Sequence, residues 1–244
     1  MKKLWPVVAL GLIAYVIFAI ATLPARLLTA RLAPAIVAGG VHGTVWNGQA
    51  QVVQSGSTFI GSASWKLHAL PLLVGRLQGN AKITRVDGFA QAEFKAGLSG
   101  TVELDDLTAS VPLAALSFAP PGWTGTLNAR LQQLTLENGW PVRAEGTIEI
   151  IDLTGPAARP ANMGNYKVTF PPGSSGDELV GALTDQGGPL DLAGNIRLKG
   201  DRSYVVEGVV AARPDAPRNV ADFLQFLGPP DSDGRRPFSI AGTL

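Results

Sequence analysis

The sequence predicts a mainly β protein, in which a single N-terminal transmembrane helix precedes a curved, largely antiparallel β-sheet domain with about one short C-terminal helix. Three observations lead to this fold class. Residues 4–23 carry no charged side chain, a glycine-led phrase recurs along the rest of the chain, and apolar and polar residues alternate within that phrase. An uncharged run of this length is typical of a membrane helix, and alternation of period two is typical of strands with one buried face.

The uncharged run at residues 4–23 contains eleven Leu, Ile, Val or Phe residues. At about −0.3 to −0.6 kcal/mol for each of them, insertion into a bilayer is favourable by about 5 kcal/mol. A helix of this length spans about 30 Å, which is the thickness of the hydrocarbon core. We therefore divide the chain into a cytoplasmic tail (1–3), a membrane anchor (4–23), a linker or helical extension (24–40) and an exported β-domain (41–244).

A cleaved signal peptide is the alternative interpretation of the same run. Lys2 and Lys3 would form its basic region, and Ala19-Ile20-Ala21 matches the small-residue pattern of a cleavage site. The run is longer, however, than the apolar core of about 7–15 residues that signal peptides carry. We therefore expect an uncleaved single-pass anchor, with its N-terminus in the cytoplasm because of the two lysines.

Charge is distributed unevenly along the chain. The stretch from Arg26 to Arg85 contains six basic residues and no acid, whereas all 19 acidic residues lie from Asp87 onward, together with 12 Lys or Arg. The basic stretch could therefore lie against anionic lipid headgroups, and a solvated surface without a partner is the alternative. We expect no nucleic-acid partner, because the basic residues are sparse and lack an interleaved aromatic platform.

A short phrase, Gly followed by Thr or Asn and then by apolar residues, marks the β-domain. It starts at five glycines: Gly79, Gly100, Gly125, Gly146 and Gly194. The first three intervals are 21, 25 and 21 residues, which suits a repeated hairpin unit. In residues 190–198 the even positions are apolar or glycine and most odd positions are polar. Such strands are expected to bury one face and expose the other.

Two interruptions and one helical pattern shape the predicted sheet. The alternation slips by one position at Gln132-Gln133 and at Ile150-Ile151, and each slip predicts a β-bulge. Residues 217–227 are the one amphipathic helical pattern after the anchor, with Gly228 as the stop. One helix cannot cover the apolar face of about ten strands. The sheet is therefore expected to curl over its own face as a trough, a barrel-like form or a sandwich.

The first hairpin of the β-domain is predicted at Asn47-Gly48, which separates two short β-prone runs. Asn-Gly favours a type I′ turn, in which both central residues need a positive φ. Further along, Pro71 interrupts the next strand, because proline cannot donate a hydrogen bond within a β-ladder.

We expect no catalytic, cofactor or metal site, and no enzyme activity. The chain has no cysteine and two histidines, and it contains neither a phosphate-binding loop nor a dinucleotide fingerprint. Asp231-Ser232-Asp233-Gly234 is similar to the start of a calcium loop. Gly242, however, occupies the position at which such a loop needs a bidentate glutamate. A tight turn is therefore the preferred interpretation of this segment.

Three phrases follow the anchor in a fixed order. They are residues 43–48 (GTVWNG), residues 65–67 with 72–77 (WKL and LLVGRL), and residues 224–228 with 231–235 (LQFLG and DSDGR) before a terminal Gly-x-Leu. Together they resemble the type II secretion system protein N family, also called general secretion pathway protein N. The family-motif residues, whose role is unknown, are Gly43, Thr44, Trp46, Gly48, Trp65, Gly228, Asp231 and Gly234.

The resemblance implies a single-pass inner-membrane protein with its C-terminal domain in the periplasm and without a cofactor. It implies an accessory role in the export of folded proteins across the outer membrane. The expected partners are other type II secretion components, on the inner-membrane platform or the secretin side, and inner-membrane lipids.

A second resemblance leads to a different function. A membrane anchor followed by a curved sheet with one apolar face is also similar to AsmA-like and lipid-transfer trough proteins of the Gram-negative envelope. In that alternative the apolar trough would hold lipid, whereas in the first the side chains of the strands fill the trough themselves.

Overall fold

The structure is a computed structural model that describes residues 5–29, 36–56, 58–97, 99–116, 119, 121–155 and 161–243. The chain forms two compact units, Met1–Val86 and Asp87–Leu244. The boundary between them coincides with the point in the sequence at which acidic residues begin. The predicted cytoplasmic tail, Arg31 and the terminal Leu244 lie outside the described residues.

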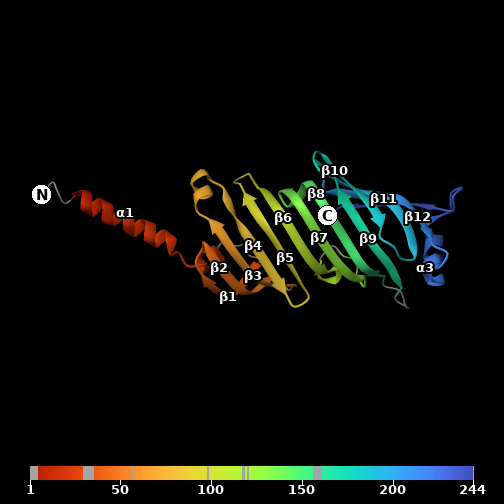
Figure 1. Cartoon of the computed structure of the whole chain (residues 1–244), viewed down its shortest axis with the longest axis horizontal. Coiled ribbons are helices and arrows are strands. Elements are labelled where there is room, and N and C mark those ends of the chain that lie inside the picture. Colours follow the sequence, from red (N-terminus) through yellow and green to blue (C-terminus); the bar gives the residue numbers. More distant parts are fainter. Residues whose placement is uncertain are drawn as a thin grey trace. The chain divides into compact units, whose positions relative to one another are not determined.

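Where the structure describes it, the first unit combines two helices, four strands and a 3₁₀ turn. Its elements are α1 (Trp5–Ala21), α2 (Arg26–Thr29), β1 (Ile36–Gly43), β2 (Asn47–Ser55), β3 (Thr58–His68), η1 (Leu70–Val74) and β4 (Leu77–Arg85). Each of these strands pairs in antiparallel fashion with its neighbour in the chain (Figure 1). β1 begins at Ile36 and not at the predicted residue 41, because Ile36 already pairs with Ser55 at the end of β2.

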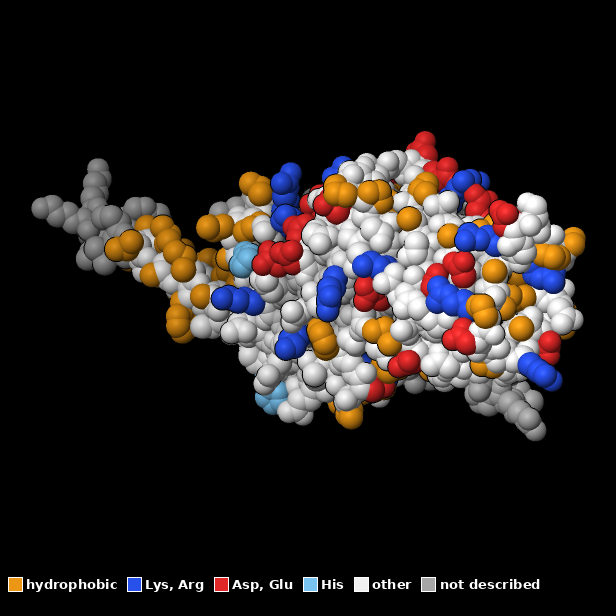
Figure 2. All heavy atoms as spheres, turned by 45° about the vertical axis from the view of Figure 1, so that its right-hand side comes forward, with side chains coloured by type: hydrophobic (Ala, Val, Ile, Leu, Met, Phe, Trp, Pro, Cys, Tyr) orange, Lys and Arg blue, Asp and Glu red, His pale blue; other side chains and the backbone are white. Residues whose placement is uncertain are grey.

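α1 contains 17 residues and exposes apolar side chains in every direction around its axis. Large exposed side chains occupy four consecutive positions, 15–18, which point about 100° apart on a helix. Figure 2 shows hydrophobic side chains along the surface of this helix. No helix in the described part of the chain is long and apolar enough to cross a membrane. The transmembrane helix predicted for residues 4–23 is therefore not confirmed.

The described residues of the second unit form nine strands and short helical segments. Its elements are β5 (Gly88–Ala96), β6 (Thr101–Pro112), η2 (Leu113–Ala115), β7 (Thr124–Glu137), β8 (Trp140–Thr154), β9 (Asn162–Phe170), β10 (Glu178–Asp185), β11 (Leu190–Lys199), β12 (Ser203–Ala212), α3 (Arg218–Phe223), η3 (Leu224–Leu227) and β13 (Arg236–Thr243). The strands follow one another in chain order, and every pair is antiparallel. Among the described strands β13 pairs with β12 alone, so this sheet is open. The prediction of a mainly β, antiparallel fold is confirmed.

The two faces of this sheet differ in chemistry. One face carries a buried cluster of Leu131, Ala144, Phe170 and Leu179. The opposite face carries cross-strand ion pairs, such as Lys167 with Glu149 at 3.4 Å and Arg197 with Glu207 at 2.7 Å. Along residues 190–198, apolar side chains at even positions pack on the buried face, which confirms the one-sided burial predicted from the alternation.

Both predicted β-bulges are present. The pairing of β7 with β8 shifts register between Leu131 and Gln133, and the pairing of β8 with β9 shifts between Ile150 and Leu153. The second bulge contains Asp152 with a φ of 54°. A bulge absorbs the extra residue, so the apolar side chains return to the same face on both sides of it.

The predicted helix over residues 217–227 is also present, as α3 followed by the 3₁₀ segment η3. Pro217 precedes its first turn, where the missing N–H of proline costs nothing. Val220 and Leu224 turn toward the apolar face, where they form a buried cluster with Leu190 and Val210. This helical segment covers one end of the apolar face.

We predict that the burial of Leu179 on the apolar face makes it a main contributor to stability. Leu179→Ala should lower the free energy of unfolding of this unit by about 2–5 kcal/mol, because the 1% exposed side chain leaves a cavity. Val180→Ala is the matched control, since Val180 lies next to it on the opposite face and is 39% exposed. Urea unfolding followed by circular dichroism measures both, and a larger loss for Val180→Ala would contradict the assignment of the faces.

Candidate functional site

In the first unit the chain that leaves α1 pairs with the turn between β1 and β2. Pro24 forms an antiparallel bridge with Thr44. The backbone N–H of Val45 donates to the carbonyl of Leu23 at 2.8 Å, and the N–H of Ala25 donates to the carbonyl of Gly43 at 3.1 Å. These bonds hold residues 23–25 extended, which explains why α1 ends at Ala21 and not at the predicted residue 23. We call residues 20–25, 43–48 and Trp65 the junction.

Two tryptophans connect the junction through their indole N–H groups. Trp46 Nε1 donates to the carbonyl of Ile20 at 2.8 Å, and Trp65 Nε1 donates to the carbonyl of Val45 at 3.0 Å. Ile20 lies in the last turn of α1, and its carbonyl also accepts a hydrogen bond from the N–H of Leu23 at 3.3 Å. The indole of Trp46 therefore caps the helix end and joins α1 to the turn that follows β1.

The prediction of a turn at Asn47-Gly48 is wrong. The chain reverses at Val45 and Trp46, while Asn47 and Gly48 already belong to β2, and neither has a positive φ. Gly48 is needed for a different reason. A Cβ at this position would lie 2.5 Å from Cζ2 of Trp65, so glycine allows the indole ring to pack against the backbone of β2.

Gly43 and Thr44 shape the same turn. Gly43 has a φ of 88°, and a Cβ there would lie 2.4 Å from the carbonyl oxygen of Asn47. The hydroxyl oxygen of Thr44 accepts a hydrogen bond from the N–H of Asn47 at 3.1 Å. Five of the eight predicted motif residues, Gly43, Thr44, Trp46, Gly48 and Trp65, are thus brought together at the junction.

The other three motif residues lie in the second unit, between η3 and β13. The carboxylate of Asp231 accepts hydrogen bonds from the N–H groups of Asp233 at 2.9 Å and Arg235 at 2.8 Å. Gly228 and Gly234 both have positive φ, and the guanidinium of Arg236 donates to the carbonyl of Gly228. The predicted tight turn at Asp231 is confirmed, and its carboxylate organises the backbone.

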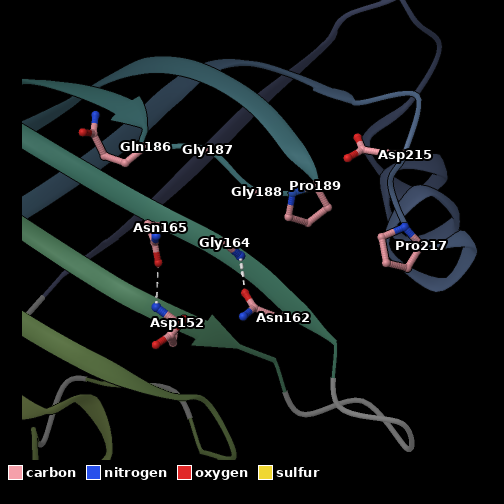
Figure 3. Close-up of a pocket in the computed structure, with 10 residues that line it drawn as sticks. All are labelled: Asp152, Asn162, Gly164, Asn165, Gln186, Gly187, Gly188, Pro189, Asp215 and Pro217. Atoms are coloured by element: carbon pink, nitrogen blue, oxygen red, sulfur yellow. Dashed lines mark hydrogen bonds between the residues drawn. The ribbon is translucent and has the colours of Figure 1, made fainter.

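A polar hollow of about 580 Å³ lies near the second bulge (Figure 3). The side-chain oxygen of Asn165 accepts from the N–H of Asp152 at 2.8 Å, and that of Asn162 accepts from the N–H of Gly164 at 2.7 Å. Both amides therefore stabilise the irregular backbone of the bulge. In the described part of the chain no group of three or more His, Cys, Asp or Glu could hold a metal ion.

A second hollow, which we call the apolar groove, has a volume of about 300 Å³ and lies on the apolar face. Its walls come from strands β8 to β13 and from η3, and they include Ile150, Leu183, Val206 and Phe238. The one phenol in the groove, Tyr166, donates its hydroxyl to the carbonyl of Met163 at 2.6 Å. The groove thus presents hydrocarbon and almost no free hydrogen-bonding group.

The ionisable groups with shifted pKa values in this region are engaged in structural contacts. Burial would raise the pKa of Asp185, but hydrogen bonds from the N–H groups of Leu192 and Gly187 and from the guanidinium of Arg213 lower it below the usual value. Burial, together with the nearby carboxylate of Asp185, raises the pKa of Tyr166 to about 12. Arg213 and Asp185 form an ion pair at 2.6 Å, which ties the end of β10 to the chain after β12.

Comparison with known proteins identifies the class to which this architecture belongs. The family model described as "Type II secretion system (T2SS), protein N" matches residues 34–239, and the chain belongs to this family. It is 27% identical, over 258 aligned residues that cover all of both chains, to the type II secretion system protein N of Aeromonas hydrophila. It is 27% identical over 217 residues, 84% of each chain, to the protein of that name from Vibrio cholerae serotype O1. No solved structure matches the chain. The family resemblance inferred from the sequence is therefore confirmed, and the family is that of a secretion component.

We predict that the close approach of Trp65 makes Gly48 intolerant of substitution. Gly48→Ala should lower the unfolding free energy of the first unit by about 1–3 kcal/mol, because the added methyl group overlaps the indole ring. Gly39→Ala on β1 is the control, since its Cβ would meet only Val52 at 3.8 Å. Tryptophan fluorescence during urea unfolding of the full chain reports both changes, and equal midpoints for the two variants would contradict the role assigned to Gly48.

Proposed function

We propose that this protein is an accessory inner-membrane component of the type II secretion system, which assists the export of folded proteins from the periplasm through contacts with other proteins. The observation that carries the proposal is the family match over residues 34–239. As a secretion-system component it would contact other proteins of that system, on the inner-membrane platform or the secretin side.

Placement in the inner membrane is part of the proposal and is supported by chemistry in the first unit. α1 exposes apolar side chains around its whole circumference, an arrangement that is unfavourable in water and favourable in lipid. The same unit contains eight Lys or Arg and no Asp or Glu, a balance that suits an anionic membrane surface. We propose that the C-terminal part of the chain lies in the periplasm.

We propose that the protein acts without catalysis. His42 and His68 are both exposed strand residues, and the perturbed groups around Asp185 serve to hold strands together. The family match is to a secretion component, and a protein of this kind acts through its surfaces. The junction is the surface that we expect to matter most, because it joins α1 to the strands through five of the motif residues.

A second candidate function, lipid binding in a trough, is favoured by the apolar groove. A peptide segment would leave its backbone N–H and C=O groups unpaired against hydrocarbon walls, which costs free energy for each group. An acyl chain has no such groups and matches the lining. The volume of about 300 Å³ lies at the lower end of the range for ligand pockets, which suits a single chain.

Deletion of the gene distinguishes the two functions. If the protein is a secretion component, folded exoproteins should accumulate in the periplasm of the deletion strain, while outer-membrane lipids change little. If it carries lipid, exoprotein release should be normal, outer-membrane lipid asymmetry should change, and stoichiometric lipid should co-purify with the protein. Normal secretion, together with the absence of other secretion components from pull-downs of the tagged protein, would contradict the first function.

Complementation of the deletion tests the junction. Trp46→Phe removes the indole donor to the carbonyl of Ile20. A loss of about 1 kcal/mol would shift the equilibrium by about fivefold toward a state in which the end of α1 is separated from the turn after β1. We therefore expect impaired secretion at normal protein levels. Trp140→Phe is the control, because Trp140 Nε1 has no hydrogen-bond partner in the described structure. Secretion at the wild-type level by Trp46→Phe would exclude a functional role for the hydrogen bond to Ile20.

The membrane placement predicts a further result. Alkaline carbonate should leave the full chain in the membrane pellet, because apolar burial does not depend on charge or salt. The intact mass should also retain the apolar run at residues 4–23. Release of the full chain into the supernatant, or loss of about twenty residues, as expected for signal-peptide cleavage, would refute the anchor.

A further inference from the structure

The 3₁₀ turn η1 carries three exposed apolar side chains between β3 and β4. Leu70, Leu72 and Val74 are 79%, 40% and 74% exposed. Exposed apolar side chains that are scattered singly need no explanation, but here three of them lie within five residues of one short turn. η1 is therefore a candidate contact site in the first unit, distinct from the junction.

η1 lies at the same end of the strands as the C-terminal end of α1. Lys66 near the end of β3 pairs with Asn47 at the start of β2, and the N–H of Leu67 donates to the carbonyl of Trp46 at 2.7 Å. η1 begins two residues after β3 ends at His68. The chain thus presents this apolar turn at the end of the sheet where the junction holds the helix.

The backbone of η1 is suited to an apolar environment. Pro71 has no N–H, the N–H of Gly75 donates to the carbonyl of Leu72 at 3.0 Å, and the N–H of Arg76 donates to the carbonyl of Pro71 at 3.0 Å. Gly75 closes the turn with a φ of 72°. Unpaired backbone groups are the main obstacle to placing a turn in lipid, and this turn pairs several of its own.

The charges around η1 indicate the chemistry of its partner. Lys66 precedes the turn and Arg76 follows it, and both are exposed. The whole unit has no acidic residue. Apolar side chains flanked by cations match a bilayer surface that contains anionic lipid, where the side chains enter the acyl region and the cations meet the headgroups.

We propose that η1 inserts Leu70, Leu72 and Val74 into the interface of the bilayer that holds α1, with Lys66 and Arg76 at anionic headgroups. This inference rests on the proposed function, because it takes α1 to be in the membrane. Two separate contacts with one bilayer would stop the first unit from rotating about the axis of α1. The unit would then present a fixed surface to its partners.

The absence of cysteine makes the test direct, because any introduced cysteine is unique. The full chain is reconstituted in nanodiscs of phosphatidylethanolamine with phosphatidylglycerol, and nitroxide labels are attached to Leu70→Cys, Val74→Cys or Ser55→Cys. Ser55 is the control, since it ends β2 at the opposite end of the same strands. Collisions of a water-soluble nickel complex with the labels at positions 70 and 74 should be at least about fivefold rarer than with the label at position 55, as expected for insertion by about 5–10 Å.

Charge reversal tests the headgroup contact. Lys66→Glu combined with Arg76→Glu should remove the protection of the label at position 74, whereas Lys82→Glu, an exposed cation on β4, should leave it unchanged. Urea midpoints for both charge variants show whether each one folds. Labels at positions 70 and 74 that are as accessible as the label at position 55 would overturn the inference.

The same measurements separate this inference from the proposed anchor. If the full chain stays in the carbonate pellet while the labels on η1 are accessible, the result contradicts only the insertion of η1 and leaves the anchor intact. Release by carbonate with protected labels in added vesicles contradicts the anchor alone and supports the membrane contact of η1.

Discussion

The second unit depends on removing one apolar sheet face from water with little help from helices. The short segment formed by α3 and η3 covers one end of this face through Val220 and Leu224. The strands themselves bury the part around Leu179, which is 1% exposed, and the apolar groove lies on the same face. Ion pairs on the opposite face are partly exposed and contribute little to stability. With no cysteine in the chain, apolar burial and the β-ladder must hold the sheet together.

Features that depend on local sequence could be predicted. The phase slips at Gln132-Gln133 and Ile150-Ile151 indicated bulges, because the alternation of side chains between faces is a property of the strand alone. The helix after Pro217 was likewise visible in the spacing of its apolar residues. The prediction of a turn at Asn47-Gly48 was wrong, because glycine is needed at position 48 for a tertiary contact, the packing of Trp65. Nothing in the dipeptide itself distinguishes a turn glycine from one that makes room for a ring.

The geometry of the junction was beyond prediction for the same reason. Trp46 and Ile20 are 26 residues apart, and no local pattern indicates that an indole will reach a helix carbonyl at that separation. The resemblance to the family indicated Trp46 and Trp65 together with Gly43 and Gly48, but it gave these residues no role. In the structure, all four lie in or against the turn between β1 and β2, to which the chain after α1 is hydrogen-bonded. From the sequence, Pro71 could be interpreted only as the interruption of a strand. The exposure of Leu70 and Val74 depends on how the neighbouring strands pair, which the sequence does not show.

The pairing of each strand with its chain neighbour has a kinetic consequence. Within each unit the contacts are close in sequence, so little loop entropy is lost before each new pair forms, and topologies of this kind fold quickly for their size. In a chain whose strands emerge from a membrane in sequence order, each strand would find its partner already in place. Folding could then proceed one hairpin at a time without waiting for the C-terminus. The strand added last always offers unpaired backbone groups to other chains, so slow emergence would prolong the exposure of each such edge and raise the risk of aggregation.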